Sequence, residues 1–185
     1  MEFIKKNPKI YILSGCAQSG KNETAKIIKE YYEKNNKKTV ILAYAKYLKD
    51  YIKEITNWDG EENTKPRELL QQLGTNIIRE ELGKDDLFIN RMIDDIDVYS
   101  CFYDAVIISD VRFKKEIWSV KKAHPEAISI HMFRPNFDNG LTEEQKKHKT
   151  EIDLDDFNEF DEEIINTTFD NLKEDAKRIY TKYER

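Results

Sequence analysis

Short strand-like runs of apolar residues alternate along this chain with longer segments in which apolar residues recur every three or four positions. The runs cover residues 10–13, 40–45, 105–108, 127–133 and 163–167. Short apolar runs are typical of buried strands, whereas recurrence at three and four positions is typical of helices. Strands that alternate with helices predict an α/β fold, a three-layer sandwich in which helices flank a five-stranded parallel sheet.

The helical patterns are clearest after the first two runs and in the middle of the chain. We expect helices over residues 21–34, 46–55 and 67–82. Pro66 suits the start of the last of these helices, and Gly83 suits its end. The chain has no repeat, low-complexity segment or long linker, so we expect all 185 residues to form a single domain.

The composition suits a soluble globular protein, with 36% charged and 39% hydrophobic residues. No apolar run approaches the roughly 20 residues that a membrane-spanning helix needs. The first six residues lack the apolar centre of a signal peptide, so we expect a cytoplasmic location. Cys16 and Cys101 match no metal-ligand spacing, and reduced thiols are expected.

The net charge of −5 argues against partners that are themselves polyanionic. Nucleic acids and anionic membranes would require a basic face, so we expect neither as a partner. Acidic residues gather at positions 151–163, where they alternate with aromatic and aliphatic residues. This pattern favours a solvated loop and helix edge over a metal site.

Candidate chemistry begins between the first strand and the first helix, where residues 14–22 read Ser-Gly-Cys-Ala-Gln-Ser-Gly-Lys-Asn. The G-x-x-x-x-G-K spacing is that of a phosphate-binding loop. Its glycines allow a sharp turn, its N–H groups face phosphate oxygens, and its lysine bridges the outer phosphates of a nucleoside triphosphate. An ordinary strand-to-helix turn is the alternative. The residues expected to bind ATP here are Gly15, Ala17, Gln18, Ser19, Gly20, Lys21, Asn22, Glu23 and Thr24.

The expected magnesium site is less regular. Asn22 stands where a serine or threonine hydroxyl usually binds Mg²⁺, so the metal would depend on Asn22 itself or on Thr24. Asp110 follows the third strand, a position from which a carboxylate can orient Mg²⁺ and its waters. A strand-end aspartate can equally cap a helix or turn. Arg112 would lie at the same mouth of the sheet.

Arginine is scarce, with 7 arginines beside 24 lysines, and five arginines lie mid-chain at positions 67, 79, 91, 112 and 134. The planar guanidinium favours bidentate binding of phosphate or carboxylate. In the helix over residues 67–82, the α-helical period predicts a polar face that comprises Arg67, Gln71, Thr75 and Ile78. The apolar face would comprise Leu69, Leu70, Leu73 and Ile77. The polar face would meet either a ligand or solvent.

A polar excursion follows the fourth strand, and we expect residues 134–150 to form a lid-like segment. Such segments often cover the nucleotide in phosphoryl-transfer enzymes, because ATP must be shielded from water during transfer. The alternative is a surface loop with a short helix that begins at Thr142, where residues 142–145 form a capping-box sequence. His148 is expected to be a surface residue.

Taken in order along the chain, these residues resemble the phage-type deoxynucleoside monophosphate kinases, P-loop enzymes with the nucleoside monophosphate kinase fold. The resemblance rests on residues 15–21, 45–49, 67–79, 108–113, 148–151 and 164–167. Its specific parts are the R-x-x-L-Q-x-L-G-T segment from Arg67 and the D-V-R-F segment from Asp110. The resemblance implies that residues 46–100 form a helical region that binds the nucleoside monophosphate.

The resemblance also implies roles for single residues. Lys21 and its loop would hold ATP, Asp110 would steer Mg²⁺ through water, and Asn166 would lie near adenine. Arg112 and Arg134 would face the transferring phosphoryl group. The monophosphate pocket would be lined by Arg67, Gln71, Thr75 and Arg79. The chain departs from the family at Asn22 and Lys46, positions where the family often has aspartate.

The expected reaction is reversible transfer of the γ-phosphoryl group of MgATP to a (deoxy)nucleoside 5′-monophosphate. ATP and Mg²⁺ would be the cofactors and small-molecule nucleotides the partners, and the protein would be a monomer or a homodimer. Two alternatives remain open. One is a P-loop kinase of another small phosphorylated acceptor, similar to the animal phosphomevalonate kinases, and the other is a nucleotide-binding module without catalytic activity. The segment from Arg67 to Arg79 favours the nucleotide acceptor.

Overall fold

The computed structural model describes residues 6–184, so the first five residues, on which the expectation about a signal peptide largely depends, lie outside the described residues. Five strands form one sheet in the order β2-β3-β1-β4-β5, and every neighbouring pair is parallel. The strands are β1 Lys9–Ser14, β2 Thr39–Leu42, β3 Ala105–Val111, β4 Ile128–Phe133 and β5 Glu162–Ile165. The expected five-stranded parallel sheet is confirmed.

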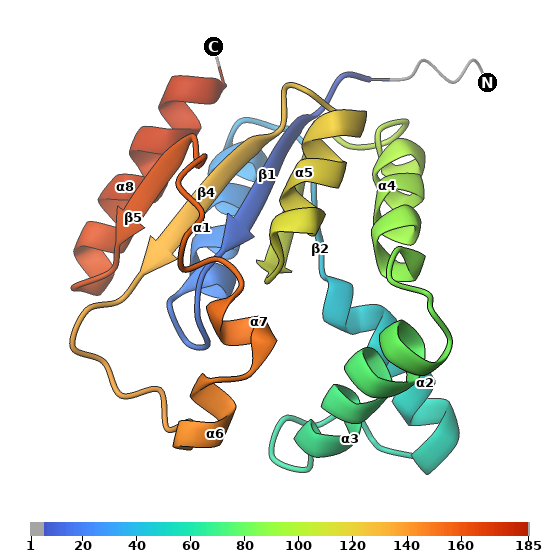
Figure 1. Ribbon diagram of the computed structural model, residues 1–185. Helices are drawn as coiled ribbons and strands as arrows, with labels where there is room; N and C mark the ends of the chain where they lie inside the picture. Colours follow the sequence, from blue (N-terminus) through green and yellow to red (C-terminus); the bar gives the residue numbers. More distant parts are fainter. Residues whose placement is uncertain (1–5, 185) are drawn as a thin grey trace.

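Helices cover both faces of the sheet, and the remaining helices lie beyond the ends of the strands toward which the arrows point (Figure 1). The helices on the faces are α1 Lys21–Lys34, α4 Leu87–Tyr99, α5 Lys114–Ala123 and α8 Phe169–Tyr183. Between β2 and α4 lie α2 Tyr44–Thr56, α3 Arg67–Gln71 and the π-helix η1 Gln72–Glu81. Between β4 and β5 lie α6 Glu143–Lys146 and α7 Lys149–Ile152. No helix within residues 6–184 has the length and apolar character needed to cross a membrane.

The sheet divides the interior into two hydrophobic clusters, because successive side chains of a strand point to opposite faces. Ile10 and Ile12 of β1 pack with residues of α4 and α5, in what we call the α5 cluster. Tyr11 and Leu13 pack with residues of α1 and α8, in the α1 cluster. Side chains from α2, η1 and the segment after α7 also join the α5 cluster. One face of the sheet therefore carries the additional helices.

The strand ends differ most from the expectation at β2 and β3, and β5 ends at Ile165 rather than residue 167. β2 ends at Leu42 rather than residue 45, and α2 begins at Tyr44. β3 continues to Val111 rather than ending at residue 108, so Asp110 lies within the strand. Both carboxylate oxygens of Asp110 accept hydrogen bonds from the backbone N–H groups of Tyr44 and Ala45, at 2.8 and 2.9 Å. Because these bonds satisfy free N–H groups at a helix start, α2 begins two residues earlier than the apolar pattern predicted.

The expected helix over residues 67–82 forms, but its winding changes at Gln72 from α to π. In a π-helix the backbone bonds connect residues five apart, so residues five apart share a face. Leu73 and Ile78 are therefore buried together, whereas Ile77 is 38% exposed. The α-helical period placed Ile78 on the polar face and Ile77 on the apolar face, and both assignments are wrong.

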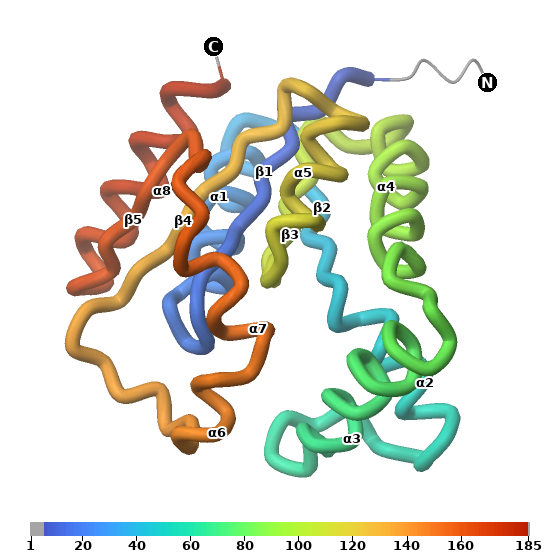
Figure 2. The backbone as a smooth tube through the Cα atoms, viewed as in Figure 1, coloured from blue at the N-terminus to red at the C-terminus, as the bar shows by residue number. Residues whose placement is uncertain are grey.

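The connection between β4 and β5 folds beside the loop that joins β1 to α1 (Figure 2). Its first helix begins where the capping-box sequence predicted. The hydroxyl of Thr142 accepts a hydrogen bond from the N–H of Gln145 at 3.2 Å, and the side-chain oxygen of Gln145 accepts one from the N–H of Thr142 at 3.0 Å. The short helix at Thr142 is confirmed.

The acidic stretch over residues 151–163 is less solvated than expected. Glu151 is half-buried and pairs with Arg112, and Glu162 is buried and pairs with Arg178. For these two carboxylates the expectation of a solvated edge is wrong. Arg178 connects Glu162 in β5 to α8, and Arg112 connects Glu151 in α7 to the end of β3.

Candidate active site

The chain between β1 and α1 forms a tight loop that depends on its glycines. Gly15 and Gly20 have φ angles of 134° and 108°, in the left-handed region that favours glycine. A Cβ on Gly15 would lie 2.2 Å from the carbonyl oxygen of Met132 in β4. A Cβ on Gly20 would lie 2.6 Å from Nδ2 of Asn166, which follows β5. The loop is therefore pressed against the ends of both strands, and this contact fixes its backbone.

Lys21, the first residue of α1, turns its side chain back into this loop. Its Nζ donates to the carbonyl oxygens of Gly15 at 2.8 Å and Cys16 at 2.6 Å. Only 7% of the residue is exposed. Burial, together with the nearby charge of Arg112, lowers the pKa of Lys21 to about 7. The loop thus encloses a cationic group that an anion would stabilise.

A second cation and a carboxylate meet at the same loop. Arg112 follows β3, and its Nη1 donates to the carbonyl oxygen of Gly15 at 3.1 Å and to Oε1 of Glu151 at 2.9 Å. The other carboxylate oxygen of Glu151 accepts a hydrogen bond from the backbone N–H of Ala17 at 2.9 Å. Glu151 belongs to α7, and it was not among the site residues that the sequence suggested.

Two carboxylates lie beside Arg112 in the fold, of which Asp110 is half-buried and Glu116 is buried. Asp110 caps α2, which is the alternative left open for an aspartate at a strand end, and burial raises its pKa. Glu116 in α5 accepts hydrogen bonds from the backbone N–H groups of Arg112 at 2.8 Å and Phe113 at 3.1 Å. Burial and the nearby Asp110 raise the pKa of Glu116 to about 7. Glu116 therefore fixes the backbone that carries Arg112.

The connection between β4 and β5 contacts the loop at further points. The Nη1 of Arg134 donates to the carbonyl oxygen of Gln18 at 3.4 Å, and its guanidinium lies 3.5 Å from the ring centre of Phe137. The side-chain amide of Gln18 donates to the carbonyl oxygen of Asn139 at 2.8 Å. The structure thus brings Arg134 onto the same loop as Lys21 and Arg112.

Asn166 joins the end of β5 to this loop. Its Nδ2 donates to the carbonyl oxygen of Ser19 at 2.9 Å, and the residue is buried. The side chain therefore supports the backbone of the loop directly. A position near adenine, which the resemblance implies for Asn166, stays a prediction.

Among the four residues expected in the monophosphate pocket, Arg79 lies against the D-V-R-F segment. Its guanidinium carbon is 4.8 Å from the ring centre of Phe113, the residue after Arg112. Its Nη1 donates at 2.7 Å to the carbonyl oxygen of Gly74, five residues earlier, as the π winding allows. The side chain of Arg79 in η1 thus reaches the segment that carries Arg112.

The other three members of that set are arranged differently. Arg67 is exposed and pairs with Glu62 at 3.1 Å. Gln71 and Thr75 are half-buried on α3 and η1. The structure therefore connects Arg79 to the loop region and turns the guanidinium of Arg67 toward the turn that precedes α3.

Asn22 and Thr24, at the start of α1, are the two residues considered as metal ligands, and only one of them has an accessible oxygen. Asn22 is exposed. Thr24 is fully buried, and its hydroxyl has no hydrogen-bond partner in the described part of the chain. Oε2 of the neighbouring Glu23 lies 3.7 Å from Nζ of Lys26, with which it forms an ion pair. Because Mg²⁺ prefers oxygen ligands and retains several waters, the exposed amide of Asn22 fits such an ion better than the buried hydroxyl of Thr24 does.

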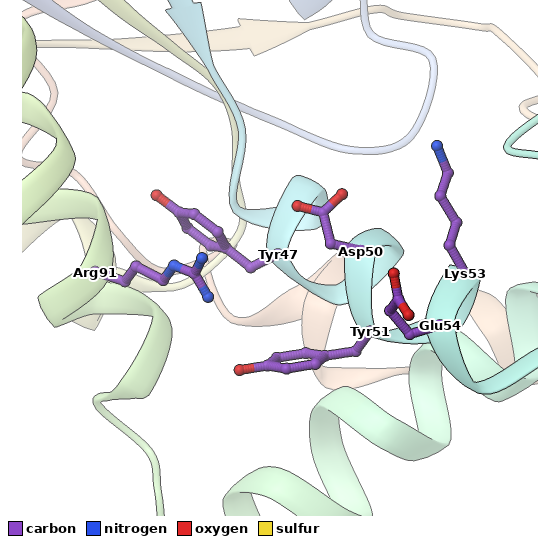
Figure 3. A pocket seen from close by; sticks show the side chains of 6 residues that line it. All are labelled: Tyr47, Asp50, Tyr51, Lys53, Glu54 and Arg91. Atoms are coloured by element: carbon purple, nitrogen blue, oxygen red, sulfur yellow. The ribbon is translucent and has the colours of Figure 1, made fainter.

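A hollow of about 300 Å³ lies between α2 and α4 (Figure 3). It is lined by Tyr47, Asp50, Tyr51, Lys53, Glu54 and Arg91. Arg91 lies over the ring of Tyr47, 4.7 Å from its centre, and the Tyr47 hydroxyl donates to Asp95 at 2.7 Å. The lining includes none of the residues expected to bind ATP or a monophosphate. Arg91 is therefore separate from the arginines at the loop.

Sequence reasoning missed Glu116 and Glu151 as parts of this site. Glu116 stands three residues after Phe113 and accepts a hydrogen bond from its N–H, but Phe113 has no side-chain oxygen, so the sequence shows no capping box here. Glu151 lies in the 148–151 segment of the resemblance, but its contact with Ala17 spans 134 positions. No local pattern signals a contact of that range.

The same fold occurs in solved structures of low sequence identity. APS kinase of Mycobacterium tuberculosis, in complex with AMPPNP and APS, is 12% identical with a TM-score of 0.59, over 97% of this chain and 99% of that chain. A gluconokinase from Sinorhizobium meliloti 1021 is 10% identical with a TM-score of 0.51, over 96% and 94%. Shikimate kinase from Bacteroides thetaiotaomicron is 12% identical with a TM-score of 0.50, over 96% and 99%.

The chain has the fold of the P-loop kinases. At 10–12% identity the likeness establishes the fold alone. No protein-family model matches the sequence, and neither does any curated protein. The expected three-layer P-loop fold is confirmed, and the three named structures are not deoxynucleoside monophosphate kinases.

Proposed function

We propose that this protein is an ATP-dependent kinase that transfers the γ-phosphoryl group to the 5′-monophosphate of a (deoxy)nucleoside. One observation carries the proposal: Lys21, Arg112 and Arg134 all donate hydrogen bonds to the backbone of one glycine-bounded loop. Three cationic side chains at one loop favour a ligand with several negative charges. The P-loop kinase fold, found in a structure that contains AMPPNP, supports ATP as that ligand.

Transfer between two phosphate groups needs alignment and charge neutralisation more than acid–base chemistry, because the transition state is loose. Lys21 would hold the outer phosphates of ATP. Arg112 and Arg134 would stabilise the charge on the group in transit. Mg²⁺, when bound, would neutralise phosphate charge, and Asn22 directly and Asp110 through water are the residues that would hold it.

The acceptor side of the proposal rests on the helical region between β2 and α4. Arg79 packs on Phe113, next to Arg112, so a monophosphate bound by Arg79 would lie close to the loop. Gln71 and Thr75 supply half-buried polar groups on the same segment. Arg67 would join them after it leaves Glu62, with which it pairs at an exposed position.

A second acceptor class has support of its own. The solved structures that share the fold include a gluconokinase and a shikimate kinase, so another small acceptor is the main alternative. The position of Arg79 favours a phosphorylated acceptor over a neutral one, because a guanidinium binds phosphate in a bidentate manner.

The test is to incubate the protein with MgATP and a panel of acceptors. The panel contains the common ribo- and deoxyribonucleoside monophosphates, phosphomevalonate, gluconate and shikimate. We expect ADP and a nucleoside diphosphate to form together, as measured by anion-exchange chromatography. Turnover of phosphomevalonate, gluconate or shikimate alone would exclude the nucleotide acceptor. Binding of ATP with no transfer to any acceptor would support the non-catalytic alternative.

A further inference from the structure

Glu151 accepts hydrogen bonds from the loop and from the arginine that the proposed function assigns to the nucleotide. Its two carboxylate oxygens accept hydrogen bonds from the N–H of Ala17 and the guanidinium of Arg112, both at 2.9 Å. A loop N–H group and an arginine are the kinds of donor with which such loops hold anions. The carboxylate is therefore bound by donors that a nucleotide phosphate would need.

The contact is largely shielded from water and has support from its neighbours. Only 13% of the Glu151 side chain and 24% of the Arg112 side chain are exposed. The thiol of Cys16 lies 3.9 Å from the carbonyl oxygen of Glu151, and Gln18 bonds to Asn139 from the same connection. Partial burial strengthens a charge-assisted hydrogen bond. The carboxylate thus holds α7 against the loop.

The charges around the loop favour the contact of Glu151 when no ligand is bound and disfavour it when phosphates are bound. The charge of Arg112 disfavours the ammonium form of Lys21, and the charge of Glu151 favours it. Glu151 thereby compensates two cations at the loop. Bound phosphates would supply several negative charges, and Glu151 would then be a like charge beside them. Phosphate and carboxylate would also compete for the same donors.

We infer that Glu151 is an internal latch: its carboxylate fills the anion site of the loop until a nucleotide phosphate displaces it. The inference rests on the proposed function, because it requires the loop to bind such a phosphate. Displacement frees the guanidinium of Arg112 and the N–H of Ala17 in one step. It also releases α7, so nucleotide binding is coupled to movement of the connection between β4 and β5.

Removal of the latch raises the apparent affinity, because an apparent dissociation constant is the intrinsic one divided by the fraction of protein with a free site. The test compares wild type with Glu151→Gln and Glu151→Ala. Glu144→Gln, which removes a carboxylate from an exposed position of α6, is the matched control. Binding of AMPPNP with Mg²⁺ and of inorganic tripolyphosphate is measured by calorimetry. Stopped-flow fluorescence with mant-labelled ATP gives the association and dissociation rates.

We expect both Glu151 variants to bind AMPPNP and tripolyphosphate on the order of tenfold more tightly than wild type does. The gain is expected in the association rate, with an unchanged dissociation rate, and Glu144→Gln is expected to match wild type. Circular dichroism establishes that each variant is folded. If wild type binds AMPPNP and the Glu151 variants bind it equally or more weakly, Glu151 supports the loop and the latch is excluded, while the proposed function stands. If wild type does not bind AMPPNP, the proposed function fails and the latch fails with it.

Discussion

At the scale of single residues, the burial of the Lys21 ammonium group in the loop lowers the stability of the folded protein. Its pKa of about 7 lies below the usual 10.5, so the folded protein disfavours the ammonium form that the unfolded chain accepts. Below pH 7 the lysine is charged in both states, and this cost is fully present. As the pH rises from 7 to 10.5 the unfolded chain binds more protons than the folded one, so the cost disappears.

Lys21→Met tests both consequences of this arrangement. We expect kcat with MgATP and the best acceptor to fall at least a hundredfold, because a preorganised charge at the phosphates is lost. The free energy of unfolding of wild type should rise relative to that of the variant by about 3 kcal/mol between pH 7 and pH 10. Chemical denaturation at several pH values measures this difference. A constant difference across that range would show that Lys21 keeps an ordinary pKa.

Which site residues the sequence could reveal depends on the range of their contacts. The lysine and glycines of the loop are six positions apart or fewer, so their spacing alone predicted a phosphate-binding loop. Asp110 was recognised as important, but its hydrogen bonds to Tyr44 and Ala45 span 66 and 65 positions. Glu151 contacts Ala17 across 134 positions. Contacts of that range follow from strand order, which spacing does not give.

At the scale of elements, η1 illustrates how the type of helix decides which side chains are buried. The start and the end of the helical segment formed by α3 and η1 were predictable, because Pro66 and Gly83 flank that segment. The π winding of η1 was not predicted, although the α-helical period left the apolar Ile78 on the polar face and Gly74 lies within the helix. The winding also brings the guanidinium of Arg79 to the carbonyl oxygen of Gly74. An α-helix of the same length would point this arginine elsewhere.

Alanine substitutions at neighbouring isoleucines test the winding. Ile78→Ala should destabilise the protein by about 2–4 kcal/mol, because Ile78 is 5% exposed within the α5 cluster. Ile77→Ala should cost less than about 1 kcal/mol, because Ile77 is 38% exposed. Urea denaturation measures both values. The reverse order would indicate an ordinary α-helix, as the apolar period had predicted.

At the scale of the whole molecule, the loop is positioned by two strands that lie at opposite ends of the sequence, β1 and β5. β1 leads into it, and Asn166 after β5 donates to its Ser19 carbonyl oxygen from 147 positions away. The side chain of Asn166 also fills the space in which a Cβ on Gly20 would lie. The conformation of the loop therefore depends on completion of the sheet.

Substitutions at Asn166 test this dependence. Asn166→Ala should lower the affinity for AMPPNP several-fold and destabilise the fold by about 1 kcal/mol, through loss of one buried hydrogen bond. Asn166→Asp should be worse in both respects, because it turns a donor into a charged acceptor that faces a carbonyl oxygen. Calorimetry and thermal unfolding measure the two effects, with Asn158→Ala, at an exposed position before β5, as the control. Equal behaviour of Asn166→Asp and wild type would contradict a structural role.

Because the sheet separates the two hydrophobic clusters, the helices on one side could be redesigned without disturbing the other side. The α1 cluster is built from strands and from α1 and α8, whereas the α5 cluster also includes α2, η1 and the segment after α7. A library of variants that targets α2 and η1 would repack the α5 cluster and leave the α1 cluster untouched. If α2 and η1 bind the acceptor, as the proposed function requires, the strands, α1 and α8 could serve as a constant scaffold onto which different helices are grafted.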